Sequence, residues 1–299
     1  MDNKINFSKF FKAANIFSAF ALIISILFLL LKGLNYGVDF KGGTLLEIRV
    51  SDTNIKIQDL RDSLRGAELG DISVKQFGKE GDFLVKFEKN ANENEKFISE
   101  LKNIISKKIN SSVNFRRVES VGPKVSSELL KQGLTAIALA LGSMLFYIWI
   151  RFEWQFSLGA IIALIHDVVI TLGIFSIMSF EVNLSIVAAV LTIVGYSMND
   201  TVVIFDRIRE NLLKYSKIKT NEIADISVNE TLSRTIITSL TTLLALFSIF
   251  ILGGEILKGF SFAMILGVVI GTYSSVFVAS PVLNYFKVTQ KTLLKDDDI

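Results

Sequence analysis

Apolar residues gather in blocks of about twenty along this chain, each long enough to cross a hydrocarbon layer about 30 Å thick. We predict six membrane-spanning helices, at Ala14–Leu34, Leu134–Ile150, Phe156–Phe180, Leu184–Phe205, Thr235–Leu252 and Phe260–Phe286. The first block is too long for the apolar core of a signal peptide, and no small-residue cleavage site follows it. We therefore interpret it as an uncleaved helix of an α-helical, polytopic membrane protein.

A polar stretch of strand and helix patterns separates the first two spanning segments. Period-two alternation predicts its strands, and helical spacing predicts its helices. In chain order they are Thr44–Val50 (strand), Ile57–Leu64 (helix), Ile72–Phe77 (strand), Asp82–Phe87 (strand), Phe97–Ile109 (helix) and Val113–Val118 (strand). Gly78 and Gly81 predict a hairpin turn between the second and third strands. The order β-α-β-β-α-β is typical of a ferredoxin-like α+β domain.

Basic residues indicate the orientation of the chain. Lysine and arginine occur before the first helix, at Arg151 after the second, in the loop 206–233 and in the tail 287–299. The loop 179–183 has none, and Gly253–Gly259 has only Lys258. Because basic loops favour the cytoplasmic side, we expect both termini to be cytoplasmic and the polar stretch to be periplasmic.

The expected organisation has four parts. Residues 1–36 hold the cytoplasmic N-terminus and the first transmembrane helix, and residues 37–120 form the periplasmic ferredoxin-like domain. Residues 121–286 form a bundle of five helices that includes the cytoplasmic loop 206–233, and residues 287–299 form a cytoplasmic tail.

Composition excludes several classes of function. The chain is 51% hydrophobic, carries a formal net charge of +3 and has no cysteine. Disulfides, thiolate nucleophiles and cysteine-zinc sites are therefore excluded, and the net charge is small for a nucleic-acid binder. The sequence shows no phosphate-binding loop, zinc-ligand cluster or serine-nucleophile elbow. We expect a protein that is not an enzyme and has no cofactor or metal.

Asp200 is the strongest candidate for chemistry inside the membrane. It follows Gly195 and Ser197–Asn199 and precedes apolar Val202–Phe205, which places it roughly 8 Å inside the bilayer at about 1.5 Å per residue. An ionisable group there is a functional candidate by default, because burial disfavours the charged form and allows a proton to be loaded and released. The alternative is a neutral acid, bonded to Asn199 or a serine, that holds helices together.

Two other sites carry ionisable side chains within or beside the membrane. His166 and Asp167 lie near the middle of the third span and form either a proton relay or a structural polar pair. Arg234 opens the fifth predicted span, with Thr235 and Thr238 following it on one face. It could pair with Asp200 or extend to the interface, and spacing alone slightly favours the interface.

Two glycine patterns complete the candidates. Asp39, Gly42 and Gly43 stand where the first helix meets the outer domain, as a hinge or simply a turn before a strand. Gly267 and Gly271 form a G-x-x-x-G pattern that permits close helix packing.

Longer motifs resemble the SecD/SecF family of protein-export membrane subunits, within the resistance-nodulation-division superfamily. The motifs are Gly37–Thr44, Val121-Gly122-Pro123, His166-Asp167, Val194–Asn211 and Ser233-Arg234-Thr235. The resemblance covers almost the whole chain, and the short outer domain favours the SecF branch over the SecD branch.

The resemblance implies a function and a set of partners. It implies a bacterial inner-membrane subunit that pairs with SecD, contacts the SecYEG channel and YajC, and uses the proton motive force to complete preprotein export. It also implies that the residues matching Asp200 and Arg234 conduct protons, which moves Arg234 from an interface residue to a functional one. In this hypothesis His166 and Asp167 tune the site, while Ser197, Asn199, Thr235 and Thr238 give polar support.

Two other functions remain open at the level of sequence. One is a half-unit of a proton-driven exporter of small molecules or lipids from the same superfamily. The other is a non-conducting scaffold for assembly of the export channel, in which Asp200 only joins helices.

Overall fold

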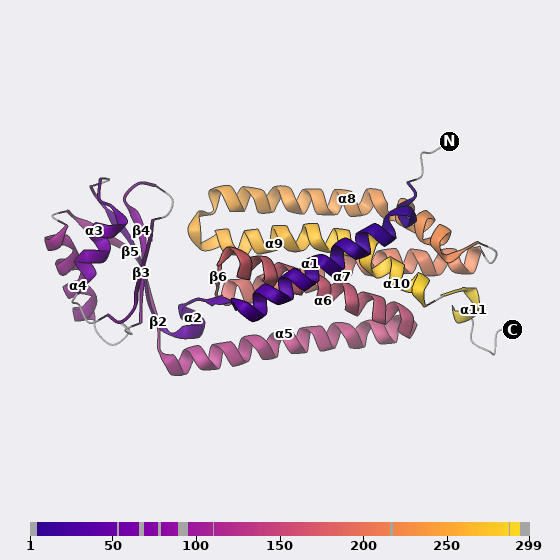
Figure 1. The fold of residues 1–299 in the computed structure, drawn as a ribbon, viewed down its shortest axis with the longest axis horizontal. Coiled ribbons are helices and arrows are strands. Elements are labelled where there is room, and N and C mark those ends of the chain that lie inside the picture. The colour runs from indigo at the N-terminus through magenta and orange to yellow at the C-terminus, as the bar shows by residue number, and fades with distance from the viewer. Residues whose placement is uncertain are drawn as a thin grey trace. The chain divides into compact units, whose positions relative to one another are not determined.

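The computed structural model describes residues 5–52, 54–65, 69–76, 79–88, 95–109, 111–215, 218–286 and 288–293 (Figure 1). Phe77 and Gly78 of the predicted hairpin, and residues 1–4, 287 and 294–299 of the predicted termini, lie outside these ranges. The chain forms two compact units. The membrane unit comprises residues 1–35, 136–181 and 185–299, and the outer unit comprises residues 36–135 and 182–184.

Long helices dominate the chain. They are α1 (Phe11–Leu31), α5 (Pro123–Arg151), α6 (Trp154–Met178), α7 (Leu184–Lys214), α8 (Thr220–Leu252) and α9 (Gly254–Ser274). Shorter helical segments are η1 (Phe7–Phe10), the π-helical η2 (Ser275–Ala279), α10 (Ser280–Tyr285) and α11 (Gln290–Leu293). Among the described residues, six helical segments are long and apolar enough to cross a membrane, which confirms the predicted number.

Helices α6, α7 and α9 form the centre of the membrane unit. About half of their most apolar residues are buried, compared with less than a fifth for α1, α5 and α8. Two glycines allow α9 to approach α7 closely: a Cβ on Gly267 would overlap the side chain of Ile193, and one on Gly271 would lie 2.9 Å from the Ser197 Cβ. The G-x-x-x-G pattern is therefore a packing surface.

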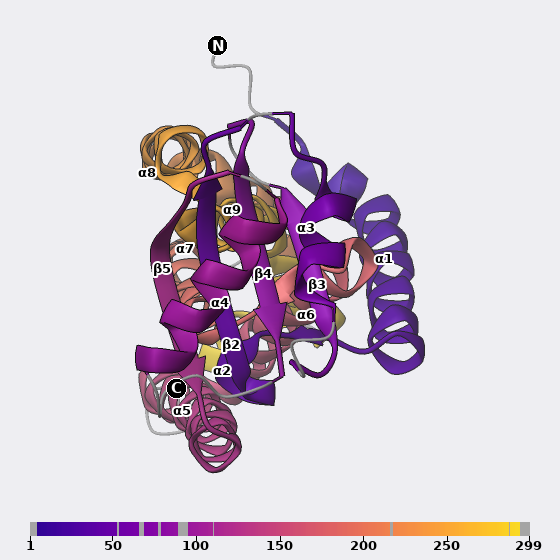
Figure 2. The ribbon, with the colours of Figure 1, turned by 90° about the vertical axis from the view of Figure 1, so that its left-hand side faces the viewer.

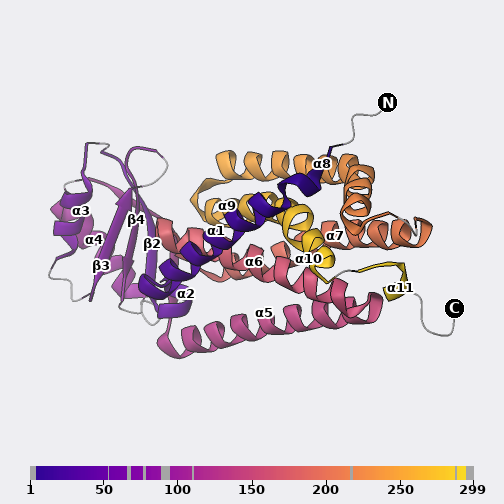
Figure 3. The same ribbon diagram turned by 45° about the vertical axis from the view of Figure 1, so that its right-hand side comes forward.

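Helices α7 and α8, both labelled in Figure 3, extend well past the predicted ends of their spans. Most of the predicted loop 206–233 is consequently helical. Polar contacts explain the extension: Arg207 Nε donates to Glu230 at 2.6 Å, and Asn211 Nδ2 donates to Ser227 Oγ at 2.9 Å. Hydropathy detects only the apolar part of a helix. Arg234 opens the predicted span for that reason, whereas in the structure it lies well inside α8.

The outer unit contains a four-stranded antiparallel sheet with both of its long helices on one face (Figure 2). Its elements are β2 (Gly43–Val50), α3 (Ile57–Leu64), β3 (Ile72–Gln76), β4 (Asp82–Phe87), α4 (Glu95–Lys108) and β5 (Val113–Val121). The order β3-β4-β2-β5 confirms the predicted ferredoxin-like domain. Alternate residues of β2 and β4, among them Ile48 and Phe83, are fully buried against the helices. A separate two-stranded sheet pairs β1 (Asn35–Tyr36) with β6 (Glu181–Val182).

An ion pair between half-exposed Arg49 and buried Asp82 joins the two central strands of this sheet. Asp82 lies opposite Arg49 in the β2–β4 register and accepts two hydrogen bonds of 2.5 Å from its guanidinium. Arg116 adds a second positive charge, with its Nη1 atom 3.8 Å from Asp82 Oδ2. The hydrogen bonds from Arg49 hold the pKa of the Asp82 carboxyl below its usual range.

We expect the outer sheet to lose stability in acid through Asp82. A carboxyl whose pKa is lower in the folded than in the unfolded state stabilises the fold at pH values above its unfolded pKa, which is about 4. That stabilisation is lost as the pH falls through the lower pKa of the folded state. Amide exchange in β2 and β4 should therefore accelerate in acid, beyond its intrinsic pH dependence, as the pH falls below about 4. In Asp82→Asn this acid-dependent step should be absent, and a step of equal size would show that other carboxyls cause it.

Candidate functional site

Asp167 is the most highly connected polar residue in the centre of the membrane unit. It is fully buried on α6. Its Oδ2 accepts hydrogen bonds from Ser197 of α7 at 2.5 Å and from Ser274 of α9 at 2.7 Å. Its Oδ1 lies 2.8 Å from His166 Nδ1. Both carboxylate oxygens are therefore satisfied, and together they join the three central helices.

His166 extends this cluster toward α1. Its ring stacks on Tyr273 with the centroids 6.2 Å apart. The Tyr273 hydroxyl donates to the Ala14 carbonyl at 2.8 Å and lies 3.0 Å from Ser18 Oγ. The buried Nε2 of His166 has no hydrogen-bond partner among the described residues. The pair thus lies where α1, α6 and α9 meet.

Asp200 differs from Asp167 in its surroundings. It lies on α7, one turn beyond Ser197, and only 4% of its surface is exposed. Its Oδ2 is buried and makes no hydrogen bond within the described part of the chain. A buried carboxylate oxygen without a partner carries the full cost of desolvation. Asp200 is therefore held in an environment that disfavours its charged form.

Arg234 acts on Asp200 through space. The two interact electrostatically, but among the described ion pairs none joins them within 4 Å. The Arg234 side chain is exposed on the surface of α8, whereas Thr235 beside it is buried with an unpartnered Oγ1. An exposed arginine directly beside the apolar part of a spanning helix is costly if it faces lipid. Its position fits a surface that is covered by protein or water.

The predicted polar supports divide into different roles. Ser197 donates to Asp167 rather than to Asp200. The Thr238 hydroxyl bonds to the backbone carbonyls of Arg234 and Thr235 within its own helix. Asn199 is exposed. No serine or asparagine bond to Asp200 occurs among the described hydrogen bonds, so the neighbours of Asp200 leave its Oδ2 unsatisfied.

Hydrogen bonds that the sequence did not predict complete the polar centre. Ser239 on α8 lies 2.7 Å from Thr272 on α9, and the Tyr196 hydroxyl donates to Ser239 at 3.5 Å. Ser274 and Tyr273 follow Thr272 along α9 and reach Asp167 and His166. The only local signal was a run of hydroxyl residues in an otherwise apolar span, at positions 272–275.

The glycine motif of the outer unit is tightly packed. Gly42 and Gly43 have φ angles of +80° and +111°. A Cβ on Gly43 would lie 2.5 Å from the Phe87 carbonyl oxygen. Asp39 belongs to the short helix α2 (Val38–Lys41), and its Oδ2 accepts a hydrogen bond from the Leu184 N–H at 2.9 Å. This motif is predicted as a hinge, and the structure gives it several fixed contacts.

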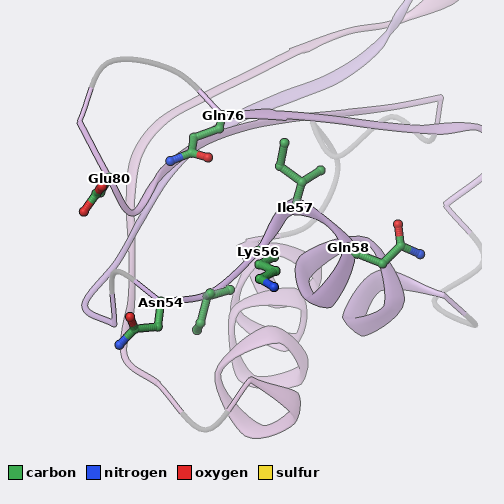
Figure 4. Close-up of a pocket in the computed structure, with 7 residues that line it drawn as sticks. Asn54, Lys56, Ile57, Gln58, Gln76 and Glu80 are labelled. Atoms are coloured by element: carbon green, nitrogen blue, oxygen red, sulfur yellow. The ribbon is translucent and has the colours of Figure 1, made fainter.

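An open hollow of about 500 Å³ lies beside the first turn of α3 (Figure 4). It is lined by Asn54, Ile55, Lys56, Ile57, Gln58, Gln76 and Glu80. Its five polar side chains are exposed, and the two isoleucines are half-buried. Within the described residues, no cluster of three or more His, Cys, Asp or Glu side chains could hold a metal ion.

Comparison with known sequences identifies the family. A model described as "Protein export membrane protein SecD/SecF, C-terminal" matches residues 101–289, and the SecD/SecF GG motif matches residues 27–53. A protein translocase subunit SecF from Cereibacter sphaeroides is 44% identical, over 96% of this chain and 92% of that protein. One from Rickettsia bellii is 41% identical, over 96% and 95% of the two chains.

A solved structure agrees with this assignment. The crystal structure of SecDF from Thermus thermophilus superposes with a TM-score of 0.87 at 33% sequence identity and covers 96% of this chain. SecDF in its super-membrane-facing form gives a TM-score of 0.68. The present chain spans 39% of the length of SecDF. By sequence and by fold, this chain belongs to the SecD/SecF family of protein-export membrane proteins.

Proposed function

We propose that this chain is the SecF-type subunit of an accessory complex that uses the proton motive force to complete preprotein export. Its partner is a SecD-type subunit, and the complex acts with the SecYEG channel and YajC. The relatives named as translocase subunits support the role in export. SecDF, in which the matching region is 39% of one longer chain, supports pairing with a SecD-type half.

Asp200 is the proton-binding residue in this proposal. The observation that carries this assignment is the contrast between the two buried carboxyls of the membrane unit. Asp167 has hydrogen-bond partners on both oxygens, whereas Asp200 has a buried oxygen with none. A satisfied carboxylate holds a structure in place, and an unsatisfied one gains most from binding a proton.

The remaining candidates act around Asp200. Arg234 supplies a positive charge that acts on Asp200 through space. His166 and Asp167 hold α6, α7 and α9 in register, and a rearrangement of α7 has to alter the bond from Ser197 to Asp167. Asp200 is thus tied to the helix-packing cluster through α7 itself.

The available driving force suits this role. One charge crossing 100 mV releases about 2.3 kcal/mol. A total driving force of roughly 150–200 mV yields about 3.5–4.6 kcal/mol per proton. Moving a two-state element from 1:99 to 99:1 requires about 5.5 kcal/mol. Two protons therefore suffice to drive the change, and one shifts the balance strongly.

We further propose that the protein lies in the bacterial inner membrane with both termini cytoplasmic and the ferredoxin-like domain periplasmic. The distribution of basic residues supports this orientation. Within the membrane unit, the first and last helical segments lie near the connection between α7 and α8. Ser8 donates to Asp225 at 2.7 Å, and Thr220 donates to the Val288 carbonyl at 2.9 Å.

Isolation and reconstitution test this function. The tagged chain should co-purify with a SecD-type subunit and with the SecYEG channel.

In vesicles containing the whole complex, an imposed proton gradient should accelerate preprotein export several-fold, and an uncoupler should remove the gain. Equal export rates with and without the gradient would contradict the motor and favour the scaffold. Gradient-driven movement of a small molecule or lipid, without any effect on preprotein, would favour the exporter.

A further inference from the structure

We infer that Asp39 is a positioning residue that fastens the beginning of α7, the helix that carries Asp200, to the glycine motif at the start of the outer sheet. This inference rests on the proposed function, in which proton binding at Asp200 drives a movement of α7. It assigns Asp39 the task of passing that movement to the outer sheet, in place of the free hinge that the sequence predicts.

The contact joins two chemically matched groups. The first N–H groups of a helix have no partner within it, and the helix dipole places positive charge there. Leu184 is the first residue of α7, and its N–H donates to Asp39 Oδ2 at 2.9 Å. A helix usually receives such a cap from the residue just before it. The acceptor of the Leu184 N–H is a residue far away in sequence, so this bond joins two separate segments.

A second bond lies beside the first. The Gly37 N–H donates to the Val182 carbonyl at 2.8 Å. The backbone on both sides of the contact is thereby held: Gly37 immediately precedes α2, and Val182 lies two residues before α7. The same two segments are thus joined by a backbone bond and by a side-chain cap.

The glycine motif is closely packed at Gly43. A Cβ on Gly42 would meet the Val121 carbonyl oxygen at the end of β5 at an ordinary contact distance of 3.4 Å. One on Gly43 would lie 2.5 Å from the Phe87 carbonyl oxygen at the end of β4. The hydroxyl of Ser126 also donates to the Val38 carbonyl at 3.3 Å. Asp39 is consequently attached to the sheet through a short and constrained segment.

Helix α7 provides a stiff link between this contact and the site in the membrane. It runs without interruption from Leu184 to Lys214. Asp200 lies about 24 Å along the axis from Leu184 at a rise of about 1.5 Å per residue. An axial shift or rotation of α7 therefore reaches its first residue, and the Asp39 carboxylate transmits it to β2, which begins at Gly43.

The test separates transmission from proton binding. In vesicles containing the whole complex, preprotein export and proton flux are measured together for Asp39→Ala and Asp39→Asn. Asp39→Ala should lower gradient-driven export about tenfold, within the usual range of couplings between sites, while proton flux stays at the wild-type level. Asp39→Asn keeps an acceptor oxygen and should retain at least about half of the export, because the hydrogen bond can still form.

Asp59→Ala is the matched control. Asp59 caps a helix of the same outer unit, accepting from the Lys56 N–H at 2.9 Å, and none of its described hydrogen bonds reaches α7. It should change neither export nor flux. Normal export by Asp39→Ala, or parallel loss of export and flux in an assembled complex, would overturn the role of Asp39. Loss of export in Asp39→Asn to the level of Asp39→Ala would also overturn it. A wild-type complex without gradient-driven export would instead overturn the proposed function itself.

Discussion

Replacing Asp200 by asparagine is expected to abolish proton-driven export while leaving the complex assembled. Asparagine has nearly the same shape as aspartic acid but cannot bind and release a proton. Because Asp200 Oδ2 makes no hydrogen bond among the described residues, no partner loses a bond in the variant. Proton flux in vesicles should fall to the background of protein-free vesicles, and the gain in export from an imposed gradient should disappear.

Asp206→Asn provides a control on the same helix. Asp206 pairs with Arg151 at 2.8 Å, and both side chains are about 40% exposed. Exposed ion pairs contribute about 0–1 kcal/mol, so this variant should retain both flux and export. Wild-type flux through Asp200→Asn at normal protein levels would remove Asp200 from the mechanism.

Replacing Asp167 by alanine is expected to destabilise the membrane unit by roughly 3–5 kcal/mol, the usual cost of removing one partner from a buried charged network. The side chains of His166, Ser197 and Ser274 would all lose their shared acceptor in the centre of the bundle. Thermal unfolding of the purified protein in detergent should shift to a markedly lower temperature, and expression should fall accordingly.

Thermal unfolding should distinguish variants of the two aspartates by their loss of stability. Asp200→Asn should unfold within about 1 kcal/mol of the wild-type protein, since it breaks no described hydrogen bond. Asp167→Asn should lie between wild type and Asp167→Ala, because its amide oxygen can still accept a bond. If Asp167→Ala unfolded like the wild type while losing proton flux, the structural assignment of Asp167 would be wrong and a relay role would replace it.

Most of the fold could be predicted because its signals are local. Six apolar blocks and the strand and helix patterns of the polar stretch each lie in short windows of sequence. The full lengths of α7 and α8 could not be predicted, because ion pairs such as Arg207–Glu230 extend both helices past their apolar parts. Such pairs depend on two helices lying side by side, and periodicity within one segment does not record this.

The ionisable residues of the candidate site are evident from the sequence, but their hydrogen-bond partners are not. Asp167, Asp200 and His166 are evident as ionisable residues within apolar blocks. Their spacing did not reveal which carboxyl is satisfied, because the partners Ser197 and Ser274 come from other helices. The partner of Asp39 was equally hidden, since Leu184 lies 145 residues further along the chain.

The contacts of the N-terminal segment constrain the order in which the protein can assemble as it is synthesised. Ser8 binds Asp225, and the Ile5 N–H donates to Asn229 at 3.0 Å. α1 packs on α6 and on η2, a segment near the C-terminus. α1 therefore gains one of its packing partners when α6 has been synthesised, and the other only after η2 has followed. Chains that end before η2 should accordingly hold α1 less firmly than the membrane unit described above.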